Sequence, residues 1–537
     1  MGKLWFGTIY TMEREGQKAE AIYSEGDRII RVGDKAALEE EFAHLIDEKI
    51  DLEDNVLFPG FIDSHLHLIG HGEKLNRLDL SGLRSKEAVL EKVKSHLENV
   101  QRGEWLIGEG WNENVWETDA VIHRSEIDFV SPDNPVILKR VCRHALIANS
   151  AALKRAGVNE NTECPPGGVI ACDNNGALNG LLKDKAMDLV LSAVPQVTDA
   201  YLERAVSSSI QDLQRLGLTG GHTEDLNYYG GYRRTINAFK KVIEQEGVRF
   251  RAHLLVHHEA VDEMVQDGGK YLGGNEWIEL GAMKIFADGS LGGRTALLSH
   301  PYNDCPETSG IAIYTQEELN GLVKKARDIS MPVAVHAIGD QAFDMILTAI
   351  ENHPLKGNGR DRLIHAQILR KDLIERVKRL PVVLDIQPVF LASDYPWVLD
   401  RIGKENMEYC YAWRTLLEEG LPCAGGSDAP IEVPDPLFGI HAAVTRTAKE
   451  DPAGRVYQPE QCLSVFEAVS LYTSGSAYAA CHENDRGIIK EGYLADFTIF
   501  DSDLFKIKDS EITNASVQMT IIGGEIVFNR KKTGEGI

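Results

Sequence analysis

The sequence lacks several features that mark other classes of protein. No stretch of its 537 residues approaches the ~18 apolar residues of a membrane span, and its first ten residues contain no long apolar core of the signal-peptide kind. Its eight cysteines are scattered and form no Cys-x-x-Cys motif, which argues against a disulfide framework, a zinc knuckle and thioredoxin-like chemistry. We therefore expect a cytoplasmic protein whose thiols are reduced.

Positive charge is also scarce. The chain has 57 Lys and Arg residues against 82 Asp and Glu residues, which gives a net charge of -25. Nucleic acids and anionic membrane surfaces would repel such a protein, so we expect neither as a partner and expect a small-molecule substrate instead. The length exceeds that of one ordinary domain, and the 43% hydrophobic and 26% charged fractions are typical of globular proteins.

The most informative motif is a pair of histidines, His65 and His67, in the run Phe58-Pro-Gly-Phe-Ile-Asp-Ser-His-Leu-His-Leu68. The run is typical of a buried strand, and residues two apart on a strand point to the same side. Both imidazoles therefore leave one face at the carboxyl end, where a divalent metal could bridge them. With 17 histidines in the chain, chance alone gives roughly 0.5 such pairs, so the pair needs support from other residues.

That support comes from further short apolar runs, each ending in a polar residue able to bind metal or act as a base. Amphipathic stretches over residues 316–330, 341–352 and 371–379 lie between them. Strands that alternate with helices in this way predict an α/β fold with a parallel (β/α)8 barrel of the TIM type, in which catalytic residues gather at one rim. The eight predicted strand tips are His67, His222, Val256, Asp288, His336, His365, Gln387 and Asp428.

The two ends of the chain, residues 1–57 and 485–537, differ from the middle because their sequence predicts short strands joined by turns. We expect them to form one composite β-sandwich, while residues 58–75 and 206–484 form the barrel. One βα unit takes about 30 residues, but 155 positions separate His67 from His222. We therefore predict a large insertion after barrel strand 1, a subdomain over residues 76–205 that acts as a lid on the catalytic rim.

The strand tips supply a set of metal donors, and the chemistry of the set predicts hydrolysis. Imidazole and carboxylate donors suit Zn²⁺, or Mn²⁺ and Fe²⁺. A charged ammonium repels a cation, but a neutral Lys284 can take up CO2 and become a carbamate that holds two metals. Such a pair would activate a hydroxide, with Asp428 passing its proton to a departing nitrogen of an amide-like bond. The donors are His65, His67, Lys284, His336, His365 and Asp428.

An ordered set of motifs runs from residue 58 to residue 497. They are Phe58-Pro-Gly-Phe-Ile-Asp-Ser-His-Leu-His, Met283-Lys-Ile-Phe-Ala-Asp-Gly-Ser-Leu-Gly-Gly-Arg-Thr295, Val335-His-Ala-Ile-Gly-Asp340, Leu363-Ile-His-Ala366, Gly426-Ser-Asp-Ala-Pro430 and Gly492-Tyr-Leu-Ala-Asp-Phe497. As a set they closely resemble the amidohydrolase superfamily, in the branch of YtcJ-like proteins and N-substituted formamide deformylases. The resemblance implies a binuclear, metal-dependent hydrolase of non-peptide carbon–nitrogen bonds, such as N-formyl, N-acyl or cyclic amides. It also implies two divalent metals, for which we expect zinc. The first would be held by His65, His67, Lys284 and Asp428, and the second by Lys284, His336 and His365.

Further candidate residues follow from the resemblance. His144, in the insertion, could polarise the substrate carbonyl as a catalytic residue, and Trp111 could form an apolar wall of the pocket beside Asn112. Asp288 and His222 are additional candidates for substrate binding. Packing is the alternative role for His144, Trp111 and His222.

Other functions stay open at this point. Ester, lactone or phosphoester hydrolysis would use the same metal centre. A mononuclear deaminase is less favoured, because that class places a glutamate where this chain has Gly339. A non-enzymatic interaction protein is least favoured, since such relatives usually lose metal ligands and all six are present here. For Lys284, the alternative to a metal-binding role is an ion pair with Asp288. A homodimer is expected because proteins of the family it resembles often form one.

Overall fold

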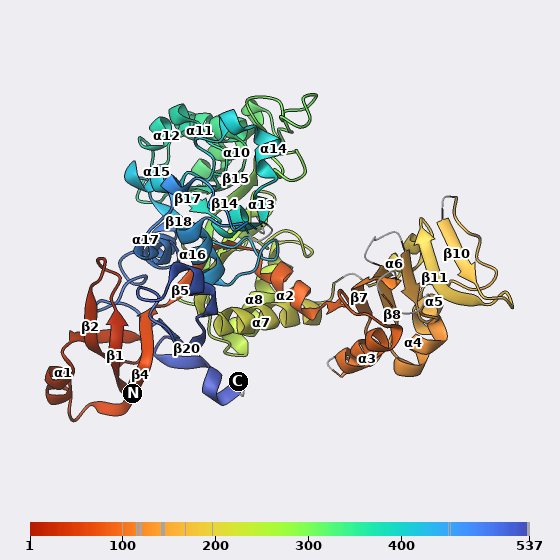
Figure 1. Cartoon of the computed structure of the whole chain (residues 1–537), viewed down its shortest axis with the longest axis horizontal. Coiled ribbons are helices and arrows are strands. Elements are labelled where there is room, and N and C mark those ends of the chain that lie inside the picture. Colours follow the sequence, from red (N-terminus) through yellow and green to blue (C-terminus); the bar gives the residue numbers. More distant parts are fainter. Residues whose placement is uncertain are drawn as a thin grey trace. The chain divides into compact units, whose positions relative to one another are not determined.

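The computed structural model describes residues 1–98, 100–113, 116, 121–140, 145–166, 168–195, 197–448, 451 and 453–533. The chain divides into two compact units, unit 1 (Met1–Gly72 and Glu203–Ile537) and unit 2 (Glu73–Leu202) (Figure 1). Unit 2 shares most of its residues with the insertion predicted over residues 76–205, whose bounds and role as a lid stay predictions. Its limits fall inside two helices, α2 (Leu68–Asn76) and α7 (Asp199–Arg215), where the sequence shows no break.

Unit 1 contains an eight-stranded sheet in which every strand is parallel to its neighbours, which confirms the predicted barrel. Neighbouring strands follow one another in chain order. The strands are β5 (Phe61–Leu66), β12 (Leu218–Thr223), β13 (Arg251–His257), β14 (Ile278–Phe286), β15 (Val333–Ala337), β16 (Asp361–His365), β17 (Val382–Ile386) and β18 (Cys423–Gly425). Each predicted strand tip lies within three residues of the carboxyl end of one of them.

Helices connect these strands, and the three amphipathic stretches in the sequence are confirmed as helices. They are α10 (Gln316–Asp328), α11 (Asp340–Asn352) and α12 (Lys371–Val377). The others around the barrel include α8 (Tyr232–Phe239), α9 (Val261–Gln266), α15 (Trp413–Glu418) and α16 (Pro436–Thr445). Helix α10 begins with a capping box, because the Thr315 hydroxyl accepts the Glu318 N–H while the Glu318 carboxylate accepts the Thr315 N–H. Within the described residues, no helix is both long enough and apolar enough to cross a membrane.

The first and last strands of the barrel meet through main-chain hydrogen bonds just beyond β18. The N–H of Asp428 donates to the carbonyl of His65 at 2.7 Å, and the N–H of His67 donates to the carbonyl of Ala429, also at 2.7 Å. Backbone groups of a buried strand need such partners. These two bonds close the barrel at its carboxyl end.

Strands from both ends of the chain pair in a second sheet of unit 1, in the order β21–β20–β19–β4–β1–β2–β3. In the middle, β4 runs parallel to β1 and antiparallel to β19. The strands are β1 (Gly2–Tyr10), β2 (Lys18–Glu25), β3 (Arg28–Gly33), β4 (Ile46–Pro59), β19 (Phe497–Phe500), β20 (Val517–Ile522) and β21 (Glu525–Asn529). The composite origin of the predicted β-sandwich is thus confirmed. Its strands form one continuous hydrogen-bonded sheet, with Trp5, Leu57 and Phe497 in a shared core.

Unit 2 has its own mixed sheet and its own hydrophobic core, as a separate subdomain requires. The sheet has the order β10–β11–β9–β8–β7–β6. Its strands are β6 (Leu78–Asp79), β7 (Leu106–Trp111), β8 (Val136–Arg140), β9 (Ala145–Ala148), β10 (Gly168–Cys172) and β11 (Leu178–Asp184). Its helices include α3 (Lys86–Leu97), α4 (Arg124–Val130), α5 (Ser150–Arg155) and α6 (Met187–Leu191). Leu138 and Ile147 are among the fully buried residues of its core.

A buried ion pair ties the barrel to the composite sheet. Arg251, the first residue of β13, donates from Nε to Asp496 Oδ2 at 2.5 Å and from Nη2 to Asp496 Oδ1 at 2.9 Å. The Asp496 carboxylate also accepts the N–H of Gly523 at 2.7 Å. Both charged side chains are buried, and the exposed Glu276 lies farther from the guanidinium, at 3.9 Å, so Asp496 is the main counter-charge of Arg251.

We expect the substitution Asp496→Ala to lower the free energy of unfolding by about 3–5 kcal/mol, because it leaves the buried Arg251 guanidinium with only the exposed Glu276, 3.9 Å away, as a counter-charge among the described residues. Urea denaturation followed by circular dichroism measures the change. The matched control is Asp328→Ala, which breaks an exposed pair with Lys324 (2.7 Å) and should change stability by less than about 1 kcal/mol. A loss in Asp496→Ala no larger than in this control would contradict the prediction.

Candidate metal centre

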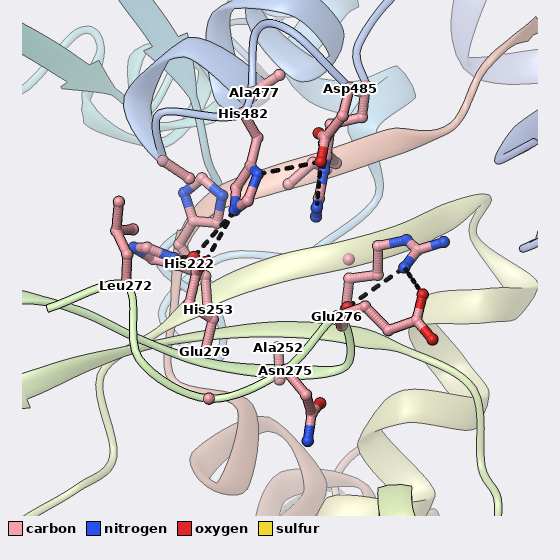
Figure 2. Close-up of a pocket in the computed structure, with 16 residues that line it drawn as sticks. His222, Ala252, His253, Leu272, Asn275, Glu276, Glu279, Ala477, His482 and Asp485 are labelled. Atoms are coloured by element: carbon pink, nitrogen blue, oxygen red, sulfur yellow. Dashed lines mark hydrogen bonds and ion pairs between the residues drawn. The ribbon is translucent and has the colours of Figure 1, made fainter. Parts of the chain in front are cut away.

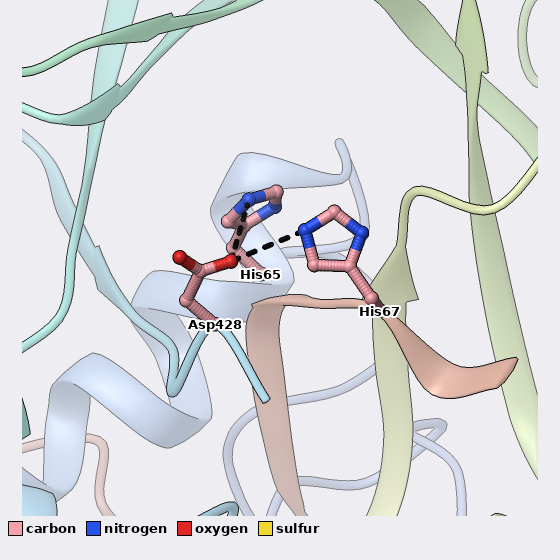
Figure 3. Close-up of side chains that lie close together, drawn as sticks. All are labelled: His65, His67 and Asp428. Carbon is pink, nitrogen blue, oxygen red and sulfur yellow. Dashed lines mark ion pairs between the residues drawn. The ribbon is translucent and has the colours of Figure 1, made fainter. Parts of the chain in front are cut away.

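Two histidines and one aspartate meet at the carboxyl end of the barrel (Figure 3). His65 is in β5, His67 follows that strand, and Asp428 lies three residues beyond β18. Asp428 Oδ1 is 3.5 Å from His65 Nε2 and 3.3 Å from His67 Nε2. One ligand atom from each residue lies within 4.8 Å of the other two, so a single cation can contact all three.

The main chain holds this cluster in a conformation that non-glycine residues rarely adopt. Asp428 has a φ of 56°, in the left-handed region, at a cost of about 1 kcal/mol or more. The Asp63 carboxylate accepts the N–H of His65 at 2.9 Å and the N–H of Ser427 at 3.1 Å. It therefore links β5 to the segment that carries Asp428. Together with the bonds that close the barrel, these contacts keep the strained residue in place.

The hydrogen bond between His67 and Glu224 determines which ring nitrogen of His67 carries the proton. Its Nδ1 lies 2.9 Å from the carbonyl oxygen of Glu224, which can only accept. Nδ1 therefore carries the proton and Nε2 presents a lone pair to the Asp428 carboxylate, a repulsive contact unless a proton or a metal lies between them. In the metal-free protein, burial lowers the pKa of His67, but the hydrogen bond and charge of Asp428 outweigh burial and raise the pKa to about 9.

A second pair of histidines, on β15 and β16, has lone pairs that face each other. His365 Nε2 is 2.8 Å from His336 Nδ1. The outer nitrogens both donate to oxygens, His336 Nε2 to the carbonyl of Gly289 at 3.0 Å and His365 Nδ1 to Gln387 Oε1 at 2.7 Å. The inner nitrogens are therefore both acceptors. Burial lowers the pKa of both rings, that of His365 to about 4. A proton shared between the two nitrogens is therefore disfavoured, and a metal ion that both nitrogens bind is the better fit.

Lys284, on β14, is fully buried, and its Nζ has no hydrogen-bond partner among the described residues. Burial lowers the pKa of the Lys284 amine, although the charges of Glu224 and Asp428 oppose the shift. A buried ammonium without a hydrogen-bond acceptor is unfavourable even with the Phe286 ring 4.2 Å from Nζ, whereas a neutral amine is the form that reacts with CO2. The unpartnered Nζ and the convergent lone pairs therefore fit the metal and carbamate chemistry expected from the sequence.

Asp288 does not pair with Lys284 in the described part of the chain. Its carboxylate accepts the N–H groups of Leu297 (2.8 Å), Ile338 (3.1 Å) and Gly339 (2.8 Å). Burial raises the pKa of Asp288 to about 7 in spite of these three bonds. The residue thus holds together the loops that follow β14 and β15, and its predicted contact with a substrate stays a prediction.

His222 lies in a different place, a hollow of about 200 Å³ (Figure 2). Residues at the beginnings of barrel strands line it, such as Arg251 in β13 and Glu279 in β14, so it belongs to the amino-terminal side of the sheet. The His222 ring packs 4.9 Å from that of His253, which bonds Glu279 at 2.8 Å, and His482 bonds the same carboxylate at 3.0 Å. Among the described residues, His222 makes no contact with the cluster of His65, His67 and Asp428. Its role in substrate binding stays a prediction.

The structure describes two of the three candidate residues in unit 2, and the roles of all three stay predictions. Trp111 is 1% exposed in the core of this unit, and its Nε1 donates to the carbonyl of Leu138 at 2.9 Å, contacts that are typical of a packing residue. Asn112 follows it and is half-buried. His144 lies outside the described residues, so its catalytic role remains a prediction.

Two groups beside the cluster were missed in the sequence. Glu224 orients His67 through its carbonyl, and its buried carboxylate accepts the hydroxyl of Tyr228 at 2.7 Å. Its position directly after β12 was a usable signal, because the residue after a barrel strand lies at the catalytic rim. The other group is Arg362 with Asp385, inside the barrel, for which the sequence offered no signal.

Comparison with known proteins gives one consistent result. The model of the amidohydrolase family matches residues 48–528. The chain is 50% identical over 531 residues to YtcJ of Bacillus subtilis (strain 168), which is named as an amidohydrolase, with 99% of this chain and 100% of that protein covered. It is 28% identical over 539 residues to the N-substituted formamide deformylase of Arthrobacter pascens, with 97% of each chain covered.

Solved structures agree with these relatives. A metal-dependent hydrolase from Pyrococcus furiosus has a TM-score of 0.77 at 28% identity, covering 94% of this chain and 100% of that chain. A second one, from Pyrococcus horikoshii OT3, has a TM-score of 0.75 at 28% identity, covering 95% and 99%. Both are described as uncharacterised.

We predict that metal uptake by the apo protein releases about one proton from the histidine–aspartate cluster at pH 7, because His67 is protonated below its pKa of about 9 and must give up that proton to a metal. Metal affinity should therefore rise from pH 7 to pH 9. Isothermal titration calorimetry in buffers of different ionisation enthalpy counts the protons. His222→Asn, outside the cluster, is the control and should behave as the wild type. An affinity that falls as pH rises would contradict the assignment.

Proposed function

The chain belongs to the amidohydrolase family and is a metal-dependent hydrolase, and from this premise we propose that it cleaves a carbon–nitrogen bond other than a peptide bond. The substrate would be a small N-formyl, N-acyl or cyclic amide, a choice supported by the likeness to a formamide deformylase. The observation that best supports a two-metal site is the contact of His336 Nδ1 with His365 Nε2, because two buried acceptors 2.8 Å apart repel each other and a metal ion bound beside both would relieve that repulsion.

The proposed ligands fall into two groups. His65, His67 and Asp428 would hold one divalent cation, and His336 and His365 a second. Lys284, as a carbamate, would serve both. These donors suit Zn²⁺, with Mn²⁺ and Fe²⁺ as alternatives. When bound, a pair of such cations lowers the pKa of water and polarises a carbonyl oxygen.

Asp428 is the proposed general base. Burial raises the pKa of its carboxyl, but the hydrogen bond from His67 and the surrounding positive charges outweigh burial and lower the pKa below its usual range. The carboxylate is therefore ionised at neutral pH and able to take a proton from the attacking water. It would then return that proton to the departing nitrogen. His144 is proposed to polarise the substrate carbonyl.

A substrate panel tests the carbon–nitrogen specificity. The metal-loaded protein should hydrolyse N-formyl, N-acyl or cyclic amides with a kcat/KM at least ~100-fold above that for matched esters, lactones and phosphoesters, because the proton held on Asp428 assists a basic nitrogen most. Release of amine, followed by a fluorogenic amine reagent, provides the measurement. Preference for the oxygen esters would replace the proposal with an esterase or lactonase function.

Lys284→Ala tests the bridging role of the lysine. We expect the variant to keep one metal or less per chain where the wild type holds about two, and to lose ~100-fold or more in kcat, because both cations lose a shared ligand. Inductively coupled plasma mass spectrometry gives the stoichiometry. Added short carboxylates or bicarbonate should restore part of the activity.

The matched control is Lys3→Ala. Lys3 is also buried, but it lies in the composite sheet, where its Nζ donates to the carbonyl of Gly524 at 2.8 Å. This variant should lose stability and keep both metals. Equal metal content in Lys284→Ala and the wild type would refute the bridging role.

A further inference from the structure

Arg362 carries a positive charge inside the barrel, where side chains of this fold are mostly apolar. It lies on β16 and is 1% exposed. Its Nε donates to Asp385 Oδ2 at 2.7 Å, and its Nη2 donates to the main-chain carbonyl of Ser64 at 2.5 Å. A buried ion pair of this kind brings little net stability over apolar residues of the same size, so stability alone does not explain it.

We propose that Arg362 is a positioning residue for the metal-binding segment at the end of β5. Ser64 directly precedes His65, and its carbonyl is held from the barrel interior by the guanidinium. Two nearby carbonyls of the same segment have other donors, the Ser476 hydroxyl on Ile62 at 3.0 Å and the Asp428 N–H on His65 at 2.7 Å. Arg362 thus supplies the inward contact that sets the direction in which the His65 ring leaves the strand.

The same side chain links the two halves of the proposed centre. Arg362 is three residues before His365 on β16, and the rings of His65 and His365 are 5.7 Å apart. On the next strand, Asp385 orients the guanidinium and Gln387, two residues later, orients His365 at 2.7 Å. Residues two apart on a strand share a face, so the same side of β17 and of the residue that follows it supports the Arg362 guanidinium and the His365 ring.

This inference rests on the proposed metal centre, and metal affinity is its direct readout. In the double variant Arg362→Met/Asp385→Leu, both charges are replaced by apolar groups, so that no buried charge is left unpaired. We expect it to fold and to bind the first Co²⁺ or Zn²⁺ about 10–100-fold more weakly than the wild type, as is usual when a group that orients a ligand is lost. Competition with a chromophoric chelator measures the affinity, and thermal unfolding of the apo protein measures stability separately.

Arg446→Met is the matched control. Arg446 is also fully buried, but its guanidinium donates to the carbonyls of Tyr457 (2.7 Å) and Tyr411 (3.0 Å) and to Gln458 Oε1 (2.8 Å), none of which belongs to the metal cluster. This variant should lower the apo unfolding temperature and leave metal affinity within about twofold of the wild type. An equal loss of metal affinity in Arg446→Met would mean that general destabilisation explains the effect, which would overturn the proposal.

Arg362→Lys separates geometry from charge and keeps the test informative even if the double variant does not fold. Lysine retains the charge beside Asp385 but not the fork that reaches Ser64 as well, so the affinity should stay reduced. Wild-type affinity in Arg362→Lys, or in the double variant, would overturn the positioning role alone. Absence of metal uptake by the wild type itself would instead overturn the proposed metal centre.

Discussion

The closure of the barrel between β5 and the segment beyond β18 is the constraint on which the candidate site depends. Two main-chain bonds, from Asp428 to His65 and from His67 to Ala429, complete the sheet and at the same time bring a carboxylate against two imidazoles. The ligands come from opposite ends of the barrel sequence, so they can meet only where its first and last strands meet. Fold and site are therefore formed by the same hydrogen bonds.

The site also concentrates features that do not favour stability. His365 and Asp428 both have positive φ values, 80° and 56°, and Lys284 is buried without a hydrogen-bond partner among the described residues. Strain and unpaired polar groups of this kind persist only when the surrounding structure holds them. The parallel strands hold these residues in place, together with the Asp63 carboxylate between β5 and the last segment.

Residues at strand ends were predictable from sequence because their signals are local. Side chains two apart on a strand point the same way, and each apolar run ends in a polar residue. The barrel, its eight strand tips and the meeting of His65, His67 and Asp428 follow from such signals. Contacts made by main-chain atoms were not predictable, which is why the Glu224 carbonyl was missed. The hollow around His222 was missed for a related reason, since strand position does not reveal towards which end of the barrel a side chain extends. The limits of unit 2 fall inside continuous helices, which leave no mark in composition.

The direction of the hydrogen bonds distinguishes a cation site from a proton relay. In a relay of histidines, one ring nitrogen donates to the next acceptor, and the chain of donors has a single direction. Here the outer nitrogens of His67, His336 and His365 donate to oxygens, two of them main-chain carbonyls that cannot reverse their role. The inner nitrogens of His336 and His365 are therefore acceptors that point at each other, and the inner nitrogen of His67 points at the Asp428 carboxylate, where it carries a proton that a metal would replace. Burial lowers the pKa of His336 and His365 and so disfavours a proton between them, which leaves a metal as the partner that this arrangement of acceptors fits best.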